Sequence, residues 1–287
     1  MQLSELNNLT RKQKLLIKDI GLHAAVVLAL VPVLFPIYWL VVSALQTPAT
    51  ITQIPPQLVP STLSLHFVNT VFSEFNIGRF LFNSVFLSVV STFLTLVVAS
   101  FAAFSHRAYS YKMKENFSKM VLFVYMFPQI LIIIPLYLLM ANLGLINTWH
   151  GLIFVYLAFE LPICIWILQS YFETIPKDLI EAAEIDGLAR VKCLWHIYLP
   201  VALPGLAASG VMTFISVWNN FLLANTLLID EDLMTLPVII ADFATRDGMM
   251  QGDVLAASLL VCIPAFFFAL FAQKFLVGGL TGGSVKG

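Results

Sequence analysis

The chain has 287 residues, of which 60% are hydrophobic and 11% charged, and its mean hydropathy is +0.91. This composition excludes an ordinary soluble domain and indicates a membrane protein. The formal net charge of -1 gives no reason to expect nucleic acid as a partner. The three cysteines, Cys164, Cys193 and Cys262, show no CxxC spacing, so we expect neither a structural disulfide nor a metal site.

The chain begins with a segment that carries basic residues, 1–22, followed by the first of six apolar stretches. Each stretch is about as long as the roughly 20 helical residues that cross the hydrocarbon core of a bilayer. The six transmembrane helices are expected at about 23–45, 81–104, 120–140, 151–172, 201–223 and 254–277. A glycine-rich tail, 278–287, follows them. The sequence therefore predicts an all-α membrane protein with one six-span domain over residues 23–277.

Prolines interrupt the predicted spans at Pro32, Pro36, Pro128, Pro135, Pro162, Pro204 and Pro264. A proline removes one backbone hydrogen bond, but neighbouring helices in a packed membrane bundle can satisfy the freed carbonyl group. We therefore expect kinks at these positions and not span ends.

Lysine and arginine determine the expected orientation, because cytoplasmic loops carry an excess of both residues. With the N-terminus inside, only Arg79 and Arg246 fall in outer segments. Both termini and the loop 173–200 are therefore expected in the cytoplasm. The larger outer loops, 46–80 and 224–253, carry several acidic residues, so the outer face is expected to be polar and mostly acidic.

The loop 173–200 contains the segment PKDLIEAAEID, residues 176–186, in which apolar residues recur near helical spacing. We expect a short amphipathic helix that ends at Gly187, and a second short helix over about 188–198. The first helix either lies flat on lipid headgroups or docks on another protein. Its acidic residues favour docking, because basic residues normally face anionic lipid.

The spacing in this loop is Glu-Ala-Ala, three residues, Gly187, nine residues, Ile197, one residue and then Leu199-Pro200. It resembles the EAA loop of permease subunits in binding-protein-dependent ABC importers. Four further stretches resemble the six-span subunit of maltose-type sugar permeases: Asn83-Ser84, VWNNFLLANTLL at 217–228, TLPVII at 235–240 and the terminal GGLTGGSVKG. Gly278 and Ser284 depart from the residues common at those positions in the family.

In that family the loop forms a coupling helix, which docks on a cytoplasmic ATPase subunit and transmits its closure to the spans. The resemblance assigns this role to Glu181, Ala182, Ala183, Glu184, Asp186, Gly187 and Leu188. It also implies the fold of a type I ABC importer permease in a bacterial or archaeal cytoplasmic membrane. The implied partners are a second homologous permease, two ATPase subunits, an extracytoplasmic substrate-binding protein, a di- or oligosaccharide and the lipid bilayer.

The phosphate-binding pattern G-x-x-x-x-G-K-[ST] does not occur in the sequence. ATP and Mg²⁺ are therefore expected on the partner ATPase subunits, and no cofactor is expected on this chain. The five histidines lie near span ends or in loops without metal-ligand spacing. We predict no catalytic residues and no metal site, and we expect a transport subunit, not an enzyme.

Five residues inside the predicted spans are candidates for the translocation path. Glu160 lies near the middle of the fourth span, where a charge costs roughly 2.5–3.5 kcal/mol on insertion scales; it either faces the solute or locks helices together. Gln129 in the third span has the same two interpretations. Trp218, Asn219 and Asn220 form either a group that stacks on and hydrogen-bonds a sugar or part of the interfacial aromatic belt.

The outer loop 224–253 contains the apolar run TLPVII, which would be unusual if fully exposed. We expect it to pack against or insert into a binding protein, or else to fold back on its own bundle. The glycine-rich tail is either disordered or reaches the ATPase subunits.

Two other functions stay open at this point: an importer permease for a different solute, and a stand-alone six-span secondary transporter or channel. A secondary transporter would predict intramembrane ion-site residues and inverted repeats. The sequence shows one intramembrane carboxylate, Glu160, and no convincing repeat.

Overall fold

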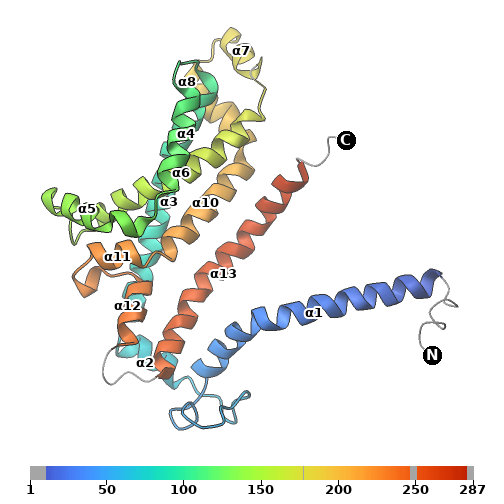
Figure 1. Ribbon diagram of the computed structural model, residues 1–287, viewed down its shortest axis with the longest axis vertical. Helices are drawn as coiled ribbons and strands as arrows, with labels where there is room; N and C mark the ends of the chain where they lie inside the picture. Colours follow the sequence, from blue (N-terminus) through green and yellow to red (C-terminus); the bar gives the residue numbers. More distant parts are fainter. Residues whose placement is uncertain (1–10, 177, 246–250, 283–287) are drawn as a thin grey trace. The chain divides into compact units, whose positions relative to one another are not determined.

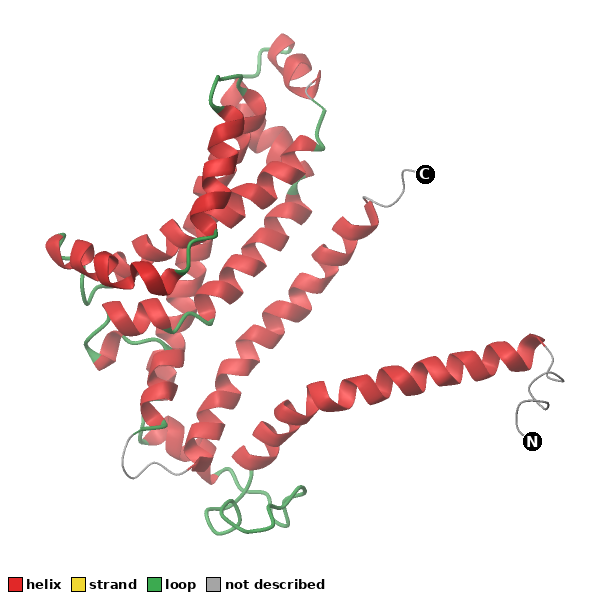
Figure 2. Cartoon of the chain, viewed as in Figure 1, coloured by secondary structure: helices red, strands yellow, loops and turns green. Residues whose placement is uncertain are grey.

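The computed structural model describes residues 11–176, 178–245 and 251–282, and every regular element in these ranges is a helix (Figure 1, Figure 2). Arg246 and the end of the predicted tail, 283–287, lie outside the described residues. The chain divides into two compact units. The first comprises residues 1–73 and 248–259, and the second comprises residues 74–247 and 260–287.

Helix α1 (Arg11–Ala44) is the longest element of the first unit, with Pro32 and Pro36 inside it. It begins at Arg11, within the segment 1–22 that was expected to precede the first span. Its stretch Lys18–Ala44 is apolar and mostly exposed. A helix that is hydrophobic on all sides fits a membrane environment, so this helix is suited to lipid or to another apolar helix.

The other helices of the first unit are α2 (His66–Ser73) and the first turns of α13 (Gln251–Gly282). Phe67 of α2 is fully buried. A Cβ added at Gly252 of α13 would lie 2.3 Å from the Phe67 ring. Gly252 therefore allows a close approach of α13 to α2 that a larger residue would prevent.

Three long helices form the centre of the second unit: α3 (Ile77–Ala108), α6 (Trp149–Glu173) and α10 (Leu203–Trp218). Helix α3 packs against both α6 and α10. Its buried face includes the small residues Ser84, Ser88, Ser91, Thr95, Ala99 and Ala103. Small side chains let membrane helices approach closely. Gly205 of α10 shows the same close packing, because a Cβ there would lie 2.4 Å from the ring of Tyr171 on α6.

Two of the predicted spans are broken. Helices α4 (Lys114–Tyr125) and α5 (Gln129–Asn142) meet at 94°, and Pro128 is the N-cap of α5. The helical segment Arg190–Val201 meets α10 at 81°, and Pro204 lies in the first turn of α10. The expectation of kinks is therefore wrong at these two prolines, where the helix ends and a new one begins at a steep angle.

In the part of the chain that the structure describes, four helices are long and apolar enough to cross a membrane, and the number rises to six if each broken pair is one span. Each of the six predicted ranges overlaps one of these helices or pairs. The remaining prolines, Pro32, Pro36, Pro135, Pro162 and Pro264, lie inside helices.

The segment after α10 folds back on the second unit. It forms α11 (Leu222–Leu227), the short 3-10 turn η3 (Glu231–Leu233) and α12 (Leu236–Phe243). The apolar run TLPVII lies at the start of α12 and buries Leu236, Val238 and Ile239. Burial within this chain corrects the expectation that the apolar run packs against a binding protein, and it agrees with the alternative of a loop folded on its own bundle.

Candidate functional site

The loop between α6 and α10 forms a small helical projection at one end of the second unit (Figure 1). Its first helix, α7 (Asp178–Ile185), lies where the sequence predicts one. The expected second helix consists of three short pieces: α8 (Arg190–Cys193), the π-helical turn η2 (Leu194–Tyr198) and α9 (Leu199–Val201). Lys177 lies outside the described residues.

Gly187 ends α7 in the way its position suggests. Its φ is +85°, in the left-handed region that favours glycine. The N–H of Leu188 donates to the carbonyl of Ala183 at 2.8 Å, and the N–H of Gly187 donates to the carbonyl of Glu184 at 3.0 Å. These two bonds form a Schellman motif, which satisfies the last carbonyl groups of the helix and fixes its length.

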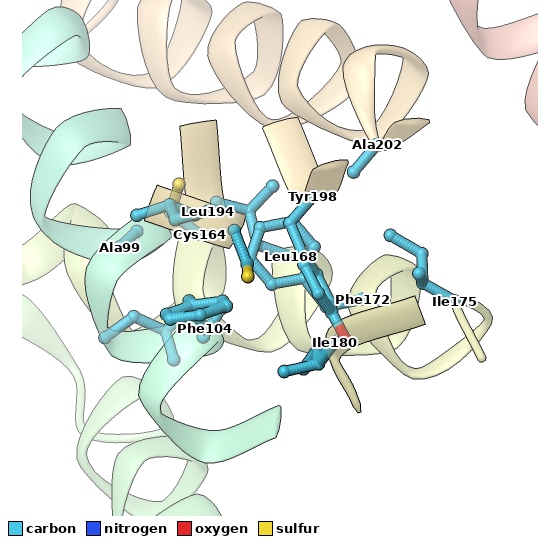
Figure 3. Packing of buried hydrophobic residues seen from close by; sticks show 13 residues of the cluster. Ala99, Phe104, Cys164, Leu168, Phe172, Ile175, Ile180, Leu194, Tyr198 and Ala202 are labelled. Carbon is cyan, nitrogen blue, oxygen red and sulfur yellow. The ribbon is translucent and has the colours of Figure 1, made fainter. Parts of the chain in front are cut away.

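One face of α7 packs on an apolar cluster beneath it. Figure 3 shows Ile180 beside Phe172 and Tyr198 in this cluster. The Tyr198 ring makes edge contacts with Phe104 and Phe172, each at a centroid distance of 5.2 Å. Ala183 and Leu188 are partly buried against the same cluster. The cluster joins residues of α3, α6 and η2, so α7 rests on the ends of the spanning helices.

The guanidinium group of Arg190 binds one side of α7. Arg190 forms a bidentate ion pair with Glu184, in which Nη2 lies 2.7 Å from Oε2 and Nε donates to Oε1. The hydrogen bond from Arg190 lowers the pKa of Glu184, and desolvation opposes it. The carboxylate is therefore ionised at neutral pH. Its contribution to stability is present above the ordinary pKa of glutamate and is lost as pH falls through the lowered value.

The opposite face of α7 is open. Glu181, Ala182 and Asp186 are exposed, and Ile185 is 87% exposed. An isoleucine between acidic residues, with a small alanine beside it, gives this face an apolar centre and a charged rim. Ile185 was not among the residues expected here. Its position was visible in the sequence, because five residues of helix rotate it to the side opposite the buried Ile180.

The seven residues assigned to the coupling role therefore divide into two groups. Glu181, Ala182, Asp186 and Gly187 face outward, whereas Ala183, Glu184 and Leu188 face the bundle or the Arg190 side chain. Ile185 belongs with the outward-facing residues, and Arg190 belongs with the residues that hold α7 on the bundle. The sequence gives no signal for Arg190, since its partner lies six residues away across the Gly187 turn.

Glu160 joins two helices of the central bundle. It is 5% exposed, and its Oε1 accepts a hydrogen bond of 2.6 Å from the Ser216 hydroxyl of α10. The nearby Tyr156 hydroxyl is buried and has no hydrogen-bond partner among the described residues. This geometry favours the interpretation of Glu160 as a link between helices, because its carboxylate is enclosed and engaged.

Trp218 is 1% exposed and lies inside the second unit. Its Nε1 donates to the Val261 carbonyl at 3.2 Å, and its ring stacks with Phe214 at a centroid distance of 5.9 Å. In this conformation the ring is enclosed by the chain's own residues and has no open face for a sugar.

The remaining candidates for the path are Asn220, Asn219 and Gln129. Asn220 Oδ1 accepts the backbone N–H of Leu223 at 3.0 Å and so holds the first turn of α11. Asn219 is exposed at the end of α10. Gln129 is the first residue of α5, beside the steep break after α4, and is partly exposed.

An open pocket of about 550 Å³, lined by both polar and apolar side chains, was not anticipated. It lies between α3, α4 and α6, at the end of the unit that carries α7, and its lining includes His106, Ser118, Gln169, Ser170 and Glu173. The Ser118 hydroxyl donates to Gln169 Oε1 at 3.2 Å. The signal was a group of three polar residues on α6, Gln169, Ser170 and Glu173, at helical spacing near the end of an apolar span.

The segment between α11 and α12 is held by polar side chains of the second unit. Asn83 Nδ2 donates to the carbonyls of Asp232 and Met234 at 2.9 and 2.8 Å. The Arg79 guanidinium pairs with the Asp232 carboxylate at 2.9 Å. On the other side, Asn147 Nδ2 donates to Asp230 Oδ2 at 2.7 Å. These contacts present the acidic turn η3 in a defined position.

The fold resembles solved transporter structures. A crystal structure of a bacterial ABC transporter involved in the import of the acidic polysaccharide alginate aligns with a TM-score of 0.80, covering 93% of this chain and 98% of that chain at 23% identity. The bacterial alginate ABC transporter in complex with an alginate pentasaccharide-bound periplasmic protein aligns with a TM-score of 0.64 at 18% identity, over 92% of this chain and 96% of that one. At these identities the likeness establishes the fold, which is that of a type I ABC importer permease.

Sequence relatives extend over nearly the whole chain. The trehalose/maltose transport system permease protein MalG of Thermococcus litoralis is 35% identical over 272 residues, which cover 94% of this chain and 98% of the relative. The sulfoquinovosyl glycerol transport system permease protein SmoH of Agrobacterium fabrum is 33% identical, over 88% of this chain and 89% of the relative. The trehalose transport system permease protein SugB of Mycobacterium tuberculosis is 32% identical, over 88% and 93%.

The family model for the binding-protein-dependent transport system inner membrane component matches residues 95–277. That range includes the α7 loop, the broken span before α10 and most of α13. The chain is a multi-pass membrane protein with the fold of its relatives, and it belongs to this family of transport permeases.

Proposed function

We propose that this chain is one permease subunit of an ATP-driven importer and forms half of the translocation pore for a carbohydrate delivered by a substrate-binding protein. The observation that carries the proposal is α7, a helix fixed from below by Ile180 and from the side by Arg190, with an open face centred on Ile185. Three relatives named for the transport of trehalose, maltose or sulfoquinovosyl glycerol support a carbohydrate as the solute.

ATP hydrolysis is assigned to two separate ATPase subunits, because this sequence contains no phosphate-binding loop. The open face of α7 is the docking surface for one of these two subunits. Ala182 allows the backbone of a partner to come close, and Ile185 fills an apolar pocket on the partner. ATP and Mg²⁺ are bound by the ATPase subunits, and a second homologous permease completes the pore.

The cycle follows from this arrangement. ATP binding closes the ATPase pair, and α7 moves with the subunit that holds it. Because α7 rests on the ends of α3, α6 and η2, its displacement turns the spanning helices. The pore then changes from inward-facing to outward-facing. Both termini and α7 lie in the cytoplasm of a bacterial or archaeal cell in this proposal.

The binding protein would dock at the opposite end of the bundle. The acidic turn η3 is exposed there and is held by Arg79, Asn83 and Asn147. Charged groups at the rim of an interface mainly guide orientation and association rate. A basic patch on a loaded binding protein is therefore the expected complement of Asp230, Glu231 and Asp232.

The test is affinity purification of the tagged chain from its own membranes in mild detergent, with the co-purifying chains identified by mass spectrometry. We expect a second permease and an ATPase subunit. In liposomes, addition of the binding protein with trehalose, maltose or a longer oligosaccharide should raise ATP hydrolysis for the transported sugar only. Solute uptake that needs no ATP and no ATPase subunit would contradict the proposal and indicate a secondary transporter.

Replacing Glu160 with glutamine should leave transport close to the parent rate. The glutamine oxygen can still accept the hydrogen bond from Ser216, so the link between α6 and α10 survives. Glu160→Ala should lower the free energy of unfolding by about 0.5–1.5 kcal/mol, the net contribution of one hydrogen bond, because the link to the Ser216 hydroxyl is lost. Thermal unfolding in detergent and sugar uptake measure the two effects. A strong loss of uptake in a stable Glu160→Gln variant would instead place the carboxylate on the solute path.

A further inference from the structure

Arg190 contacts more than its ion-pair partner. Its Nη1 lies 3.4 Å from the carbonyl oxygen of Ala108, and its guanidinium carbon lies 5.5 Å from the centroid of the Tyr109 ring. Ala108 is the last residue of α3, and Tyr109 is its C-cap. One side chain therefore joins α7, through Glu184, to the end of a helix long enough to cross the membrane.

The chemistry of this end of α3 favours a guanidinium. The last carbonyl groups of a helix lack partners within the helix and carry partial negative charge. A cation over a tyrosine ring is also attracted to the ring face. Arg190 thus has an anchor on α3 that does not depend on Glu184, and its planar fork presents two parallel donors to the Glu184 carboxylate.

The start of the loop has its own link to the same helix end. Arg107, in the last turn of α3, donates from Nη2 to the carbonyl of Ile175, three residues before α7 begins. The loop is thus tied to α3 both before and after α7. Between the two ties, α7 buries Ile180 and partly buries Ala183, a small apolar contact that leaves the angle of the helix to the polar links.

We propose that Glu184 and Arg190 are positioning residues that hold α7 at a fixed angle to α3, so that a displacement of α7 is transmitted to α3. This inference rests on the proposed function. Without the pair, α7 would still dock on its ATPase subunit through its outer face, but it would pivot on Ile180 when pushed. ATP would then be hydrolysed without a matching movement of the spanning helices.

Stability alone does not explain the arrangement. Both side chains are partly exposed, and exposed ion pairs add little to the free energy of folding. Loss of the pair should therefore leave the chain folded and assembled. What a bidentate pair supplies is geometry, because two parallel hydrogen bonds restrict rotation in a way that a single contact does not.

The test compares Glu184→Ala, Arg190→Ala and the double variant in the assembled importer, reconstituted with its ATPase subunits and binding protein. The number of sugar molecules taken up per ATP hydrolysed should fall about fivefold or more in each single variant, the lower end of typical coupling between sites. Co-purification of the ATPase subunit should be unchanged. The double variant should be no worse than Arg190→Ala, because both changes break one link. Arg190→Lys keeps the charge without the fork and should give partial rescue.

Lys192→Ala is the matched control. Lys192 is exposed on α8, two residues from Arg190, and its replacement should leave the uptake per ATP at the parent value. Amide hydrogen exchange across residues 181–188 should be faster in Glu184→Ala than in the parent or the control, which reports a looser attachment of α7 independently of transport.

Single variants that keep the parent uptake per ATP, or losses that add in the double variant, would overturn the positioning role. Loss of the ATPase subunit from the parent complex would instead show that the proposed function is wrong, and the inference would fall with it. The two failures are distinguished by the co-purification measured on the parent chain.

Discussion

Changing Ile185 to aspartate should reduce sugar uptake by at least about tenfold and weaken the association of the ATPase subunit. Ile185 is 87% exposed, so a polar residue there should change the stability of the chain itself by no more than about 0.5 kcal/mol. In the docked complex the same residue would be buried, and an unpaired buried carboxylate costs several kcal/mol. Uptake in liposomes and co-purification of the ATPase subunit measure the effect.

The matched control for this prediction is Ile185→Leu, which keeps an apolar side chain of the same size. We expect near-parent uptake and full association in this variant. If Ile185→Asp assembled and transported like the parent, the open face of α7 would not be the docking surface. Cross-linking of α7 to lipid and not to protein would lead to the same conclusion.

Trp218→Ala should lower the free energy of unfolding by about 3–5 kcal/mol, the range seen when large buried aromatic residues are removed. The ring is enclosed, stacks on Phe214 and donates to the Val261 carbonyl. Its loss would leave a cavity between α10 and α13 and an unpaired carbonyl group. Thermal unfolding of the detergent-solubilised chain should show a clear drop in Tm.

Trp218→Phe separates the two contributions at this site. Phenylalanine keeps an aromatic ring for stacking but loses the N–H donor, so the cost should fall to about 1–3 kcal/mol. Sugar uptake measured well below the melting temperature should be unchanged in this variant. Selective loss of sugar uptake with an unchanged Tm would instead restore Trp218 as a residue of the solute path.

The helical fold follows from hydropathy, but the breaks do not. Length and apolar composition predict six apolar stretches, because a bilayer requires about 20 consecutive apolar residues, and each predicted range overlaps a long apolar helix or a broken pair of helices. Prolines alone could not predict where a span breaks: Pro135 and Pro162 lie within helices, whereas Pro128 and Pro204 lie at steep bends. Whether a proline ends a helix depends on which neighbours satisfy the freed carbonyl group, and that is a tertiary property.

The α7 helix could be predicted from its pattern of residues, while the roles of single side chains could not. Periodicity places Ile180 inward and Ile185 outward once the helix is assumed. The burial of Trp218 and the pairing of Glu160 with Ser216 depend on the packing of α6, α10 and α13. A polar or aromatic residue inside a span has the same sequence signature whether it faces a solute or another helix.

Helix α3 is long enough to cross a membrane, and each of its ends is bound to a loop. At one end Asn83 and Ser84 bind the turn η3 and the first residue of α12, and at the other Arg107 and Ala108 bind the loop around α7. Its 32 residues span roughly 48 Å at 1.5 Å per residue. In the proposed importer, a binding protein that favours one tilt of α3 at the η3 end would lower the free energy of ATPase closure at the α7 end, and closure would raise the affinity for the binding protein by the same factor.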